Sequence, residues 1–352
     1  MSGVPHPAEG DGLVGITSTI PVEAVFAAGL VPVDMNNLFI AHPRRAALIE
    51  KAHEQGFPQG SCAWIKGIYG AVIEGGVPRV IGVVRGDCSA TAVLLEALEL
   101  AGVEVLPFEY PASRSGASML TAIDSLCGSL GTDIKAAAAW LERLHPARKS
   151  LHELDELCWR EGKVCGEENH TWLVSSSDFC SDPAAFEQRL SSFLDQARAR
   201  KPLEKRPLPY AKEVRLAYAG VPPINTDIFE LAEQAGARFV FCEVQRQFSM
   251  PAAATLGRVG AGDLARVYLD YTYPYSVRGR ARDINTECDI REVDGIVHYV
   301  QSFCFRNLEG AVFSKLLSRP VLSLECDCPG ELGAPARARL ENFIQVLGEN
   351  LQ

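Results

Sequence analysis

The sequence lacks the features that mark membrane-spanning and secreted proteins. In its 352 residues no apolar run reaches the roughly 20 residues that a membrane helix needs. The segment from Met1 to Asp11 contains Pro, His and acidic residues in place of a basic and then apolar signal region. Eleven cysteines, an odd number, then favour thiols and metal ligation over a disulfide framework. We therefore expect a cytoplasmic protein without a membrane partner.

Basic charge is also scarce. The chain has 34 Lys and Arg against 44 Asp and Glu, a formal net charge of -10 and a pI near 5.3. No run of Lys and Arg with interleaved aromatic residues occurs, so we expect no nucleic-acid partner. The hydrophobic fraction of 47% and the charged fraction of 22% are typical of globular proteins, and the length suffices for two domains.

Common nucleotide and hydrolase motifs are missing as well. The stretch Gly257 to Gly262 does not fit GxGxxG, and no GxxxxGK followed by Ser or Thr occurs. There is no GxSxG motif either, and Ser175 to Asp178 is more typical of a polar loop or helix cap than of a nucleophile. These absences argue against ATP or NAD binding by the usual loops.

Strand and helix patterns alternate in two parts of the chain. A buried strand at 77–84, an amphipathic helix at 88–101 and a strand at 103–108 form a βαβ unit, which predicts a parallel sheet. A second alternation begins near residue 210, and its stretch between 244 and 294 has no clear pattern. The expected elements of this second part are strands at 214–219, 238–244, 294–300 and 320–324, and helices at 225–235 and 335–347.

Between these parts the strand signals vanish, and helical spacing recurs at 134–144, 151–159 and 186–199. A charged, proline-containing linker follows at 201–209. The predicted fold is α/β, with two Rossmann-like doubly wound parallel-sheet domains joined by a helical segment. The predicted boundaries are 1–112 for the N-terminal domain, 113–209 for the helical insertion and linker, and 210–352 for the C-terminal domain.

Three cysteines each precede an amphipathic stretch typical of a helix, and two of these follow a buried strand. They are Cys62, Cys88 and Cys304. A helix N-terminus presents free N–H groups and a partial positive charge, which favour thiolates and a net-negative iron–sulfur core. Ligands of doubly wound sheets lie beyond the carboxyl ends of the strands, so we expect Cys88 and Cys304 to face the crevice between the domains.

Spacing alone makes this trio a weak metal signature, because no CxxC motif is present. Cys326 and Cys328 follow the last predicted strand, where they could ligate a second cluster or bridge a larger one. Alternating side chains of a strand point to opposite faces, however, so both reach one site only if the chain turns there. The remaining candidates have simpler interpretations, as small buried hydrophobes for Cys127, Cys158, Cys180 and Cys242, and as a polar loop for the possible metal pair Cys165 and His170.

Two segments of the second domain could contact a substrate. The segment Gly220 to Asp227 ends in a helix cap whose N–H groups could bind an anionic group, although ordinary capping explains it equally well. Gln245 to Gln247 brings a guanidinium to the end of a strand, for which a surface ion pair is the simpler explanation.

Several segments resemble one family, the 2-hydroxyacyl-CoA dehydratases and benzoyl-CoA reductases. The likeness runs in order across nearly the whole chain and is specific at the level of the family. It rests on Ile20 to Gly29, Gly86 to Thr91, Glu167 to His170, Trp172 to Asp178, Asp294 to Cys304 and Leu322 to Asp327.

The resemblance implies a subunit with two Rossmann-like domains and a [4Fe-4S] cluster held by three cysteines, which match Cys62, Cys88 and Cys304. It also implies a dimer, either of identical chains or with a related subunit, and a separate ATP-hydrolysing iron–sulfur activator. In the dehydratases the electron from this activator forms a ketyl radical of the thioester, which expels the 2-hydroxyl group. One branch of the family instead carries a double-cubane [8Fe-9S] cluster and reduces small molecules.

The chain departs from the family pattern in the acidic turn after the last strand, where Cys326 replaces an expected small residue and Cys328 follows. The number of cubes is therefore open at this point. The favoured interpretation is the iron–sulfur subunit of a dehydratase-like enzyme acting on an acyl-CoA thioester, a lyase or an ATP-dependent reductase. The alternatives are a double-cubane reductase of small molecules and a non-catalytic subunit that carries electrons or a cluster.

Overall fold

The computed structural model describes residues 12–202, 210, 212–256 and 260–351. The greater part of the predicted linker at 201–209 and the first half of the glycine-rich stretch at 257–262 lie outside the described residues. The described chain divides into two compact units. The first contains the chain through Ser150, with Val174–Arg189 and Phe248–Tyr275, and the second contains Leu151–Leu173, Leu190–Gln247 and the chain from Ser276 onward.

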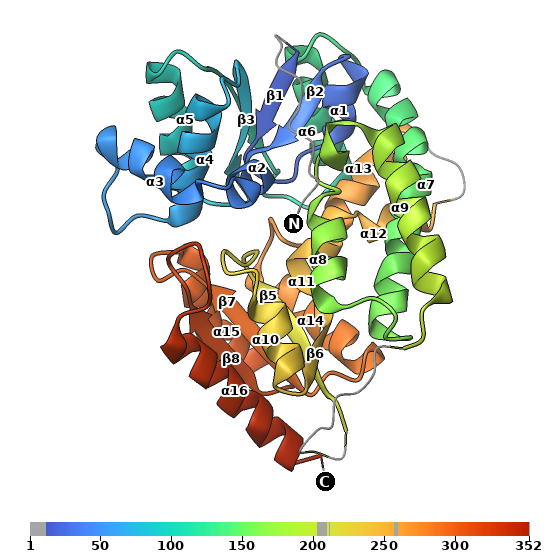
Figure 1. Cartoon of the computed structure of the whole chain (residues 1–352). Helices are drawn as coiled ribbons and strands as arrows, with labels where there is room; N and C mark the ends of the chain where they lie inside the picture. The colour runs from blue at the N-terminus through green and yellow to red at the C-terminus, as the bar shows by residue number, and fades with distance from the viewer. Residues whose placement is uncertain (1–11, 203–209, 211, 257–259, 352) are drawn as a thin grey trace. The chain divides into compact units, whose positions relative to one another are not determined.

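Each unit contains a four-stranded sheet in which all strands are parallel (Figure 1). The strand order is β2-β1-β3-β4 in the first sheet and β6-β5-β7-β8 in the second, so the two sheets have the same topology. The α/β class with two Rossmann-like parallel sheets is therefore confirmed. The strands are β1 Leu13–Ile16, β2 Val31–Asp34, β3 Arg79–Arg85, β4 Glu104–Glu109, β5 Val214–Gly220, β6 Ala237–Cys242, β7 Gly295–Val300 and β8 Val321–Glu325.

Burial on both faces explains the near-continuous apolar strands. Every residue of β1, β6 and β7 is buried, because helices cover the two faces of each sheet. In the first unit α4 (Ala63–Glu74) and α5 (Ala90–Leu100) contact each other, and α6 (Gly116–Ser129) contacts α1 (Val22–Ala27) (Figure 1).

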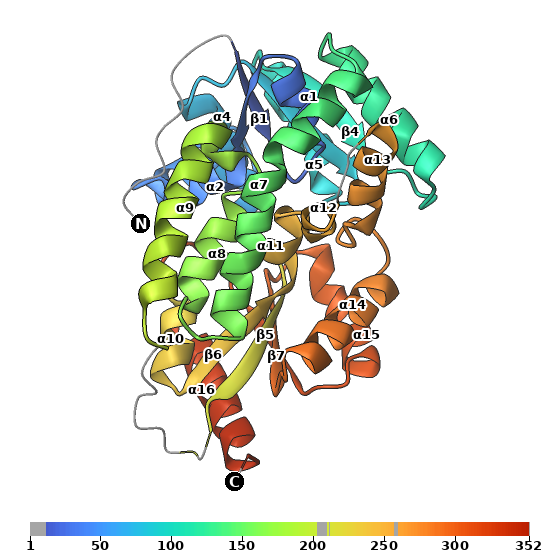
Figure 2. The same cartoon turned by 90° about the vertical axis from the view of Figure 1, so that its right-hand side faces the viewer.

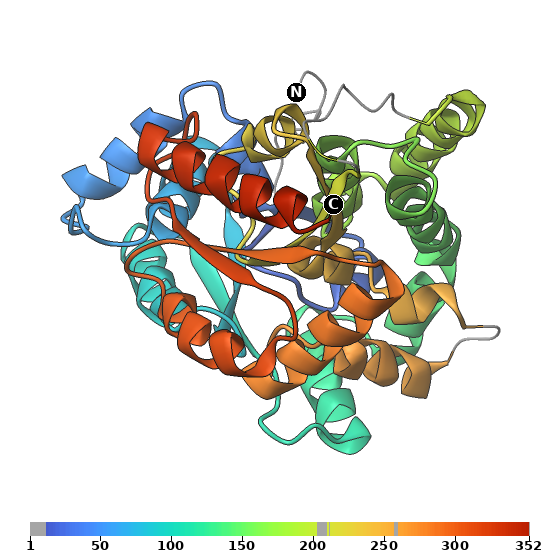
Figure 3. The same ribbon diagram turned by 90° about the horizontal axis from the view of Figure 1, so that it is seen from below.

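The second unit repeats this arrangement. Helix α16 (Ala334–Glu349) contacts α10 (Ile228–Gln234), and α14 (Val277–Ile290) contacts α15 (Glu309–Leu316). Figure 3 shows α16 on one face of the second sheet and α14 with α15 on the other. The remaining helices are α2 Met35–Ala41, α3 Arg45–Glu54, α7 Ile134–Trp159, α8 Gly166–Val174, α9 Pro183–Ala199, α11 Glu243–Phe248, α12 Pro251–Ala254 and α13 Ala261–Asp270, with 3-10 turns η1 Phe179–Ser181 and η2 Phe305–Leu308.

Two expectations about the helices are wrong. The segments at 134–144 and 151–159 form one helix, α7, which continues through Pro146. The stretch between 244 and 294 is largely helical, with α11 to α14 in place of irregular chain. Its arginines hid the pattern, since Arg280 is wholly buried on the same face of α14 as Ala281 and Ile284.

The helical middle segment contributes to both units. Helices α7, α8 and α9 all cross a boundary between the units in sequence. Within the second unit, the later parts of α7 and α9 lie alongside α8 (Figure 2). Arg198 pairs with Glu153 at 2.6 Å, and the rings of Trp172 and Phe193 are 5.5 Å apart. The linear domain boundaries at 112 and 209 stay a prediction.

Candidate functional site

Cys62, Cys88 and Cys304 each lie at the start of a helix. Cys62 is the residue before α4, and Cys304 is the residue before η2, which leads into α15. Cys88 lies two residues before the first residue of α5. All three are half-buried. The N–H groups of a first helical turn have no partner within the helix, so these positions favour a thiolate over a thiol.

Cys88 and Cys304 occupy equivalent places in the two sheets. Cys88 follows β3 and Cys304 follows β7, and these strands are third in chain order within sheets of identical topology. In each sheet the second strand in chain order lies on one side of the first strand, and the third strand lies on its other side. The carboxyl ends of β1 and β3, and of β5 and β7, therefore flank a topological switch point, where doubly wound sheets bind ligands.

Cys62 has a different counterpart. Helix α4 leads into β3 just as α14 leads into β7, so the residue equivalent to Cys62 is Ser276 at the start of α14. The hydroxyl of Ser276 accepts the Gly279 N–H at 3.3 Å, which is ordinary helix capping. The shared topology thus provides four equivalent helix starts, of which three carry cysteine and one carries serine.

Most of the other cysteines are held as thiols by burial. Burial raises the pKa of Cys127 and Cys180 to about 11 and that of Cys158 and Cys288 to about 12. The pKa of Cys242 is raised well above its ordinary value by the same cause. Cys127, Cys158 and Cys242 are buried, as their interpretation as small buried hydrophobes requires, whereas Cys180 is half-buried.

Cys326 and Cys328 differ sharply in exposure. Cys326 is buried, and burial raises its pKa to about 11, whereas Cys328 is exposed. The Cys326 N–H donates to Val300 O at 2.9 Å, and in the first unit the Tyr110 N–H donates to Arg85 O at 3.1 Å in the same way. Cys326 therefore takes the structural place of Tyr110, one residue beyond the edge strand of its sheet.

The possible metal pair Cys165 and His170 lies at a helix, and the expected polar loop is wrong. The Cys165 sulfur accepts the Glu168 N–H at 3.4 Å, while the Glu168 carboxylate accepts the Cys165 N–H at 3.1 Å. This reciprocal pair is a capping box that starts α8. His170 is buried against Phe229, with ring centroids 4.9 Å apart, and burial lowers its pKa to about 3.

The two substrate-contact candidates make internal contacts. Arg246 pairs with Asp283 at 3.2 Å and with Glu287 at 3.5 Å. In the segment from Gly220 to Asp227, the Asn225 amide and the Asp227 carboxylate hydrogen bond to the loop after β8. Arg246 therefore forms ion pairs, although its side chain is partly buried and not on the surface. Asp227, the N-cap residue of α10, makes no side-chain capping bond, so ordinary capping does not describe the first segment.

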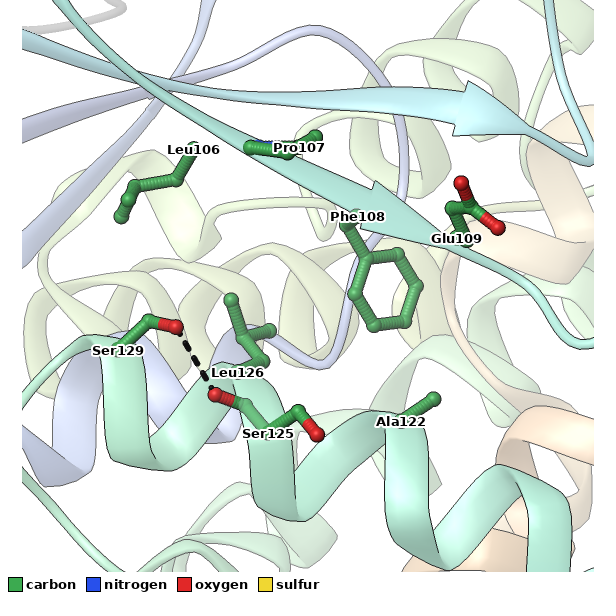
Figure 4. A pocket seen from close by; sticks show the side chains of 8 residues that line it. All are labelled: Leu106, Pro107, Phe108, Glu109, Ala122, Ser125, Leu126 and Ser129. Atoms are coloured by element: carbon green, nitrogen blue, oxygen red, sulfur yellow. Dashed lines mark hydrogen bonds between the residues drawn. The ribbon is translucent and has the colours of Figure 1, made fainter.

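A groove of about 370 Å³ lies between β4 and α6 in the first unit (Figure 4). The Glu104 N–H donates to Pro78 O, on the side of β3. Because the N–H groups of successive strand residues point to alternate sides, the backbone nitrogen of residue 107 faces away from β3. That residue is Pro107, which has no N–H, so this edge resists pairing with a further strand. The lining contains none of the candidate cysteines and consists of Leu106, Pro107, Phe108, Glu109, Ala122, Ser125, Leu126 and Ser129.

Thiolate ligands at helix starts fit an iron–sulfur cluster, whose protein ligands are thiolates and whose charge is negative. Cys62 and Cys88 belong to the first unit and Cys304 to the second. In the part of the chain that the structure describes, no three His, Cys, Asp or Glu side chains form a group that could hold a metal ion. The joining of the three cysteines as one ligand set stays a prediction.

Comparison with known families identifies the chain's relatives. The sequence profile of the family described as 2-hydroxyglutaryl-CoA dehydratase, D-component, matches residues 17–347. The chain belongs to this family. The match contains every strand except β1 and all candidate cysteines. Proteins of the D-component family are dehydratase components that in general bind iron–sulfur clusters. No curated protein matches the chain, and no helix among the described residues is long and apolar enough to cross a membrane.

Sequence reasoning missed the polar contacts around the cysteines. The Asp327 carboxylate binds Ser302, two residues before Cys304. Sequence patterns contain no signal for this contact, because one aspartate in a loop forms no recognisable motif. It also missed the carboxyl pair Asp34 and Asp178, which are 144 residues apart in sequence. The Asp34 N–H donates to Asp178 Oδ2 at 2.7 Å, and both side chains are buried.

Proposed function

We propose that this chain is the iron–sulfur subunit of a 2-hydroxyacyl-CoA dehydratase-like enzyme. Cys62, Cys88 and Cys304 hold a [4Fe-4S] cluster, a separate ATP-hydrolysing activator supplies low-potential electrons, and the substrate is an acyl-CoA thioester. Membership of the D-component family supports the enzyme class. The observation that carries the ligand assignment is the equivalent placement of Cys88 and Cys304 after the third strand of two sheets with one topology.

The chain's own residues would hold the cluster and stabilise its charge. Cys62, Cys88 and Cys304 would supply thiolates, and the N-termini of α4, α5 and η2 that they precede would stabilise the negative charge of the cluster. Three protein ligands leave one iron with an open position, so the bound cluster supplies both a redox centre and a Lewis acid.

Iron and sulfide analysis of anaerobically purified protein, with EPR of the reduced form, tests this proposal. We expect about four irons per chain for a single cube. Replacing Cys62, Cys88 or Cys304 with Ala should remove the cluster signal, because each loss leaves only two thiolates. Cys158→Ala is the matched control, since this buried cysteine lies at the end of α7 and not at the start of a helix. Wild-type protein without iron would overturn the proposal.

A double-cubane cluster is the second candidate, favoured by the position of Cys326 and Cys328 directly after β8. About eight irons per chain, lost on replacement of either cysteine, would support it. Four irons retained in Cys326→Ala and Cys328→Ala would exclude it. The burial of Cys326 beside Tyr299 supports the single cube, because burial raises the pKa of this cysteine to about 11 and so favours a thiol over a thiolate ligand.

The thioester and the oligomeric state require separate measurements. Binding of acyl-CoA thioesters to the loaded protein, followed by product analysis with an activator, tests the substrate class. If thioesters neither bind nor react, the chain is instead a reductase of small molecules or a subunit that carries electrons. Mass measurement of the anaerobic protein, alone and with a related subunit, distinguishes a homodimer from a heterodimer.

A further inference from the structure

We propose that Asp327 is a positioning residue for Cys304, and that Asn225 and Tyr299 hold the loop from which Asp327 acts. This inference rests on the proposed function, in which Cys304 ligates the cluster. All the contacts that support it lie within the second unit. In this proposal the segment Cys326-Asp327-Cys328 positions Cys304 through the carboxylate of Asp327.

Asp327 binds Ser302 through both carboxylate oxygens. Its Oδ1 accepts the Ser302 N–H at 2.7 Å, and its Oδ2 accepts the Ser302 hydroxyl at 2.7 Å. Hydrogen bonds to a carboxylate are shorter and stronger than neutral ones, and two bonds to one residue fix its orientation. Asp327 therefore joins the loop after β8 to the turn after β7.

Ser302 belongs to the turn that presents Cys304. The Cys304 N–H donates to Gln301 O at 3.0 Å, and the Asn307 N–H donates to Cys304 O at 2.9 Å. These two bonds tie the backbone of Cys304 to the residues on either side of it. Because Asp327 fixes Ser302 within the same turn, it restricts where the Cys304 backbone can lie.

The loop that carries Asp327 is itself held in place by Asn225. The Asn225 amide lies 3.1 Å from Cys328 O, 3.1 Å from Gly330 O and 3.2 Å from Glu331 O. Asn225 is 3% exposed, so these bonds form away from water. Asp227 adds a fourth anchor by accepting the Leu332 N–H at 2.9 Å.

Tyr299, in β7, holds Asn225 in turn, and we call the contacts of Asn225 and Tyr299 with the loop after β8 the clamp. Its hydroxyl donates to Asn225 Oδ1 at 2.7 Å and accepts the Ile224 N–H at 3.2 Å. Gly220 allows β5 to approach β7 closely, because its φ is +113° and a Cβ there would lie 2.0 Å from Tyr299 O. The ends of β5, β7 and β8 thus form one bonded assembly around the Cys304 turn.

Asp327 also brings a negative charge near the proposed ligand. A nearby carboxylate disfavours the addition of an electron to a cluster, so removing its charge should raise the reduction potential. The variant Asp327→Asn distinguishes the effect of the negative charge from the effect of the hydrogen bonds to Ser302. The Asn amide oxygen can accept the Ser302 N–H, while its NH2 group donates to the Ser302 oxygen, whose own proton can bond Glu325 Oε2 at 3.2 Å.

The first test uses metal-free protein and measures the alkylation rate of each cysteine by mass spectrometry of its peptide. In Asp327→Ala, Cys304 should react roughly five- to tenfold faster, because the turn loses two charge-assisted hydrogen bonds that are partly screened by water. Ser302→Ala should give a smaller increase, since it keeps the backbone bond, and Asp327→Asn should restore a near wild-type rate.

Asp289→Ala is the matched control, because it removes another exposed carboxylate from the second unit, one that pairs with Arg319 at 2.9 Å. Buried Cys288 reports on general unfolding and should stay slow in every variant. Equal Cys304 rates in Asp327→Ala, Asp289→Ala and wild type would overturn the positioning role.

The second test uses the cluster-loaded protein. Asp327→Asn should retain the iron content and raise the reduction potential, whereas Asp327→Ala should also broaden or shift the EPR signal as Cys304 loses its fixed position. An unchanged potential and spectrum in both variants would overturn the role. If wild type binds no iron, the proposed function fails, and the alkylation test still decides whether Asp327 positions Cys304.

Discussion

The two sheets share one strand order, yet polar groups hold their carboxyl ends differently. At the end of the second sheet, Asn225, Tyr299 and Asp327 join three loops by hydrogen bonds. At the end of the first sheet, the Tyr110 hydroxyl donates to Thr19 O at 2.8 Å, and its ring packs against Gly86. The same topology therefore places equivalent cysteines on turns that have different supports.

Their buried charges differ as well. In the second unit Arg280 pairs with Glu243 at 2.7 Å and also with Glu309, in a fully buried group. The first unit also buries an ion pair, Arg148 with Glu23 at 2.7 Å. In addition it buries Asp34 and Asp178 together, and among the described residues neither of these two forms an ion pair with a cation. A carboxyl pair without a cation is expected to retain a proton, whereas paired charges stay ionised.

The largest effect on stability is expected when Arg280, the central cation of the buried group in the second unit, is removed. Arg280→Ala leaves Glu243 buried without this cation, whereas Glu309 keeps its pair with Arg306 at 3.0 Å. The loss should lower the free energy of unfolding by about 3–5 kcal/mol. Urea unfolding measures the change. The control is Arg337→Ala, whose pair with Glu341 is exposed, and this variant should unfold much as wild type does. Equal losses in both variants would contradict the assigned role.

The carboxyl pair of the first unit should make stability depend on pH. Burial and the nearby Asp34 raise the pKa of Asp178 from its ordinary 3.8 to about 7, so between these values the folded protein keeps a proton that the unfolded chain releases. The free energy of unfolding should therefore fall as pH rises through this window, by about 1–4 kcal/mol, and level off above it.

Urea titrations from pH 4 to pH 8 measure this slope. Asp178→Asn should flatten it, although the variant is less stable overall because it loses one acceptor for the Asp34 or Cys180 N–H. Asp182→Asn is the control, since this exposed carboxylate caps α9 four residues further on. A wild-type slope in Asp178→Asn would show that other groups cause the pH dependence.

A smaller effect should follow from opening the clamp of the second unit. Asn225→Ala removes the amide that binds three carbonyls, which should cost about 1–3 kcal/mol. Hydrogen exchange should then accelerate at the Leu332 N–H and its neighbours, and stay unchanged at the Tyr110 N–H in the first unit. Acceleration at both places would indicate general destabilisation and not a local clamp.

The smallest effect is expected at Ser276, the residue equivalent to Cys62. Ser276→Ala removes a long capping bond and should lower the free energy of unfolding by about 0.5 kcal/mol. Iron content should stay at the wild-type value, whereas Cys62→Ala should lose the cluster. If Ser276→Ala also loses iron, the serine at the fourth equivalent helix start takes part in holding the cluster.

Local pattern was sufficient for much of the fold. Strand β3 and helix α5 were predictable because an apolar run and an amphipathic run adjoin, and a helix between two such strands implies a parallel sheet. Helix α14 was not predictable, since Arg280, which ion pairs hold in the interior, interrupts its apolar face. Cys88 and Cys304 could be found because strand, thiol and helix follow one another in sequence, and Cys62 because an amphipathic stretch follows it.

The sequence by itself determined the α/β class, the family and three cysteines at the starts of helices, because each of these depends on neighbouring residues or on long matching segments. Only the tertiary structure showed that Cys88 and Cys304 are equivalent, that Ser276 corresponds to Cys62, and that Asp327 binds the turn of Cys304. Such relations depend on strand order and on contacts between residues far apart in the chain, and these arise only when the sheets form.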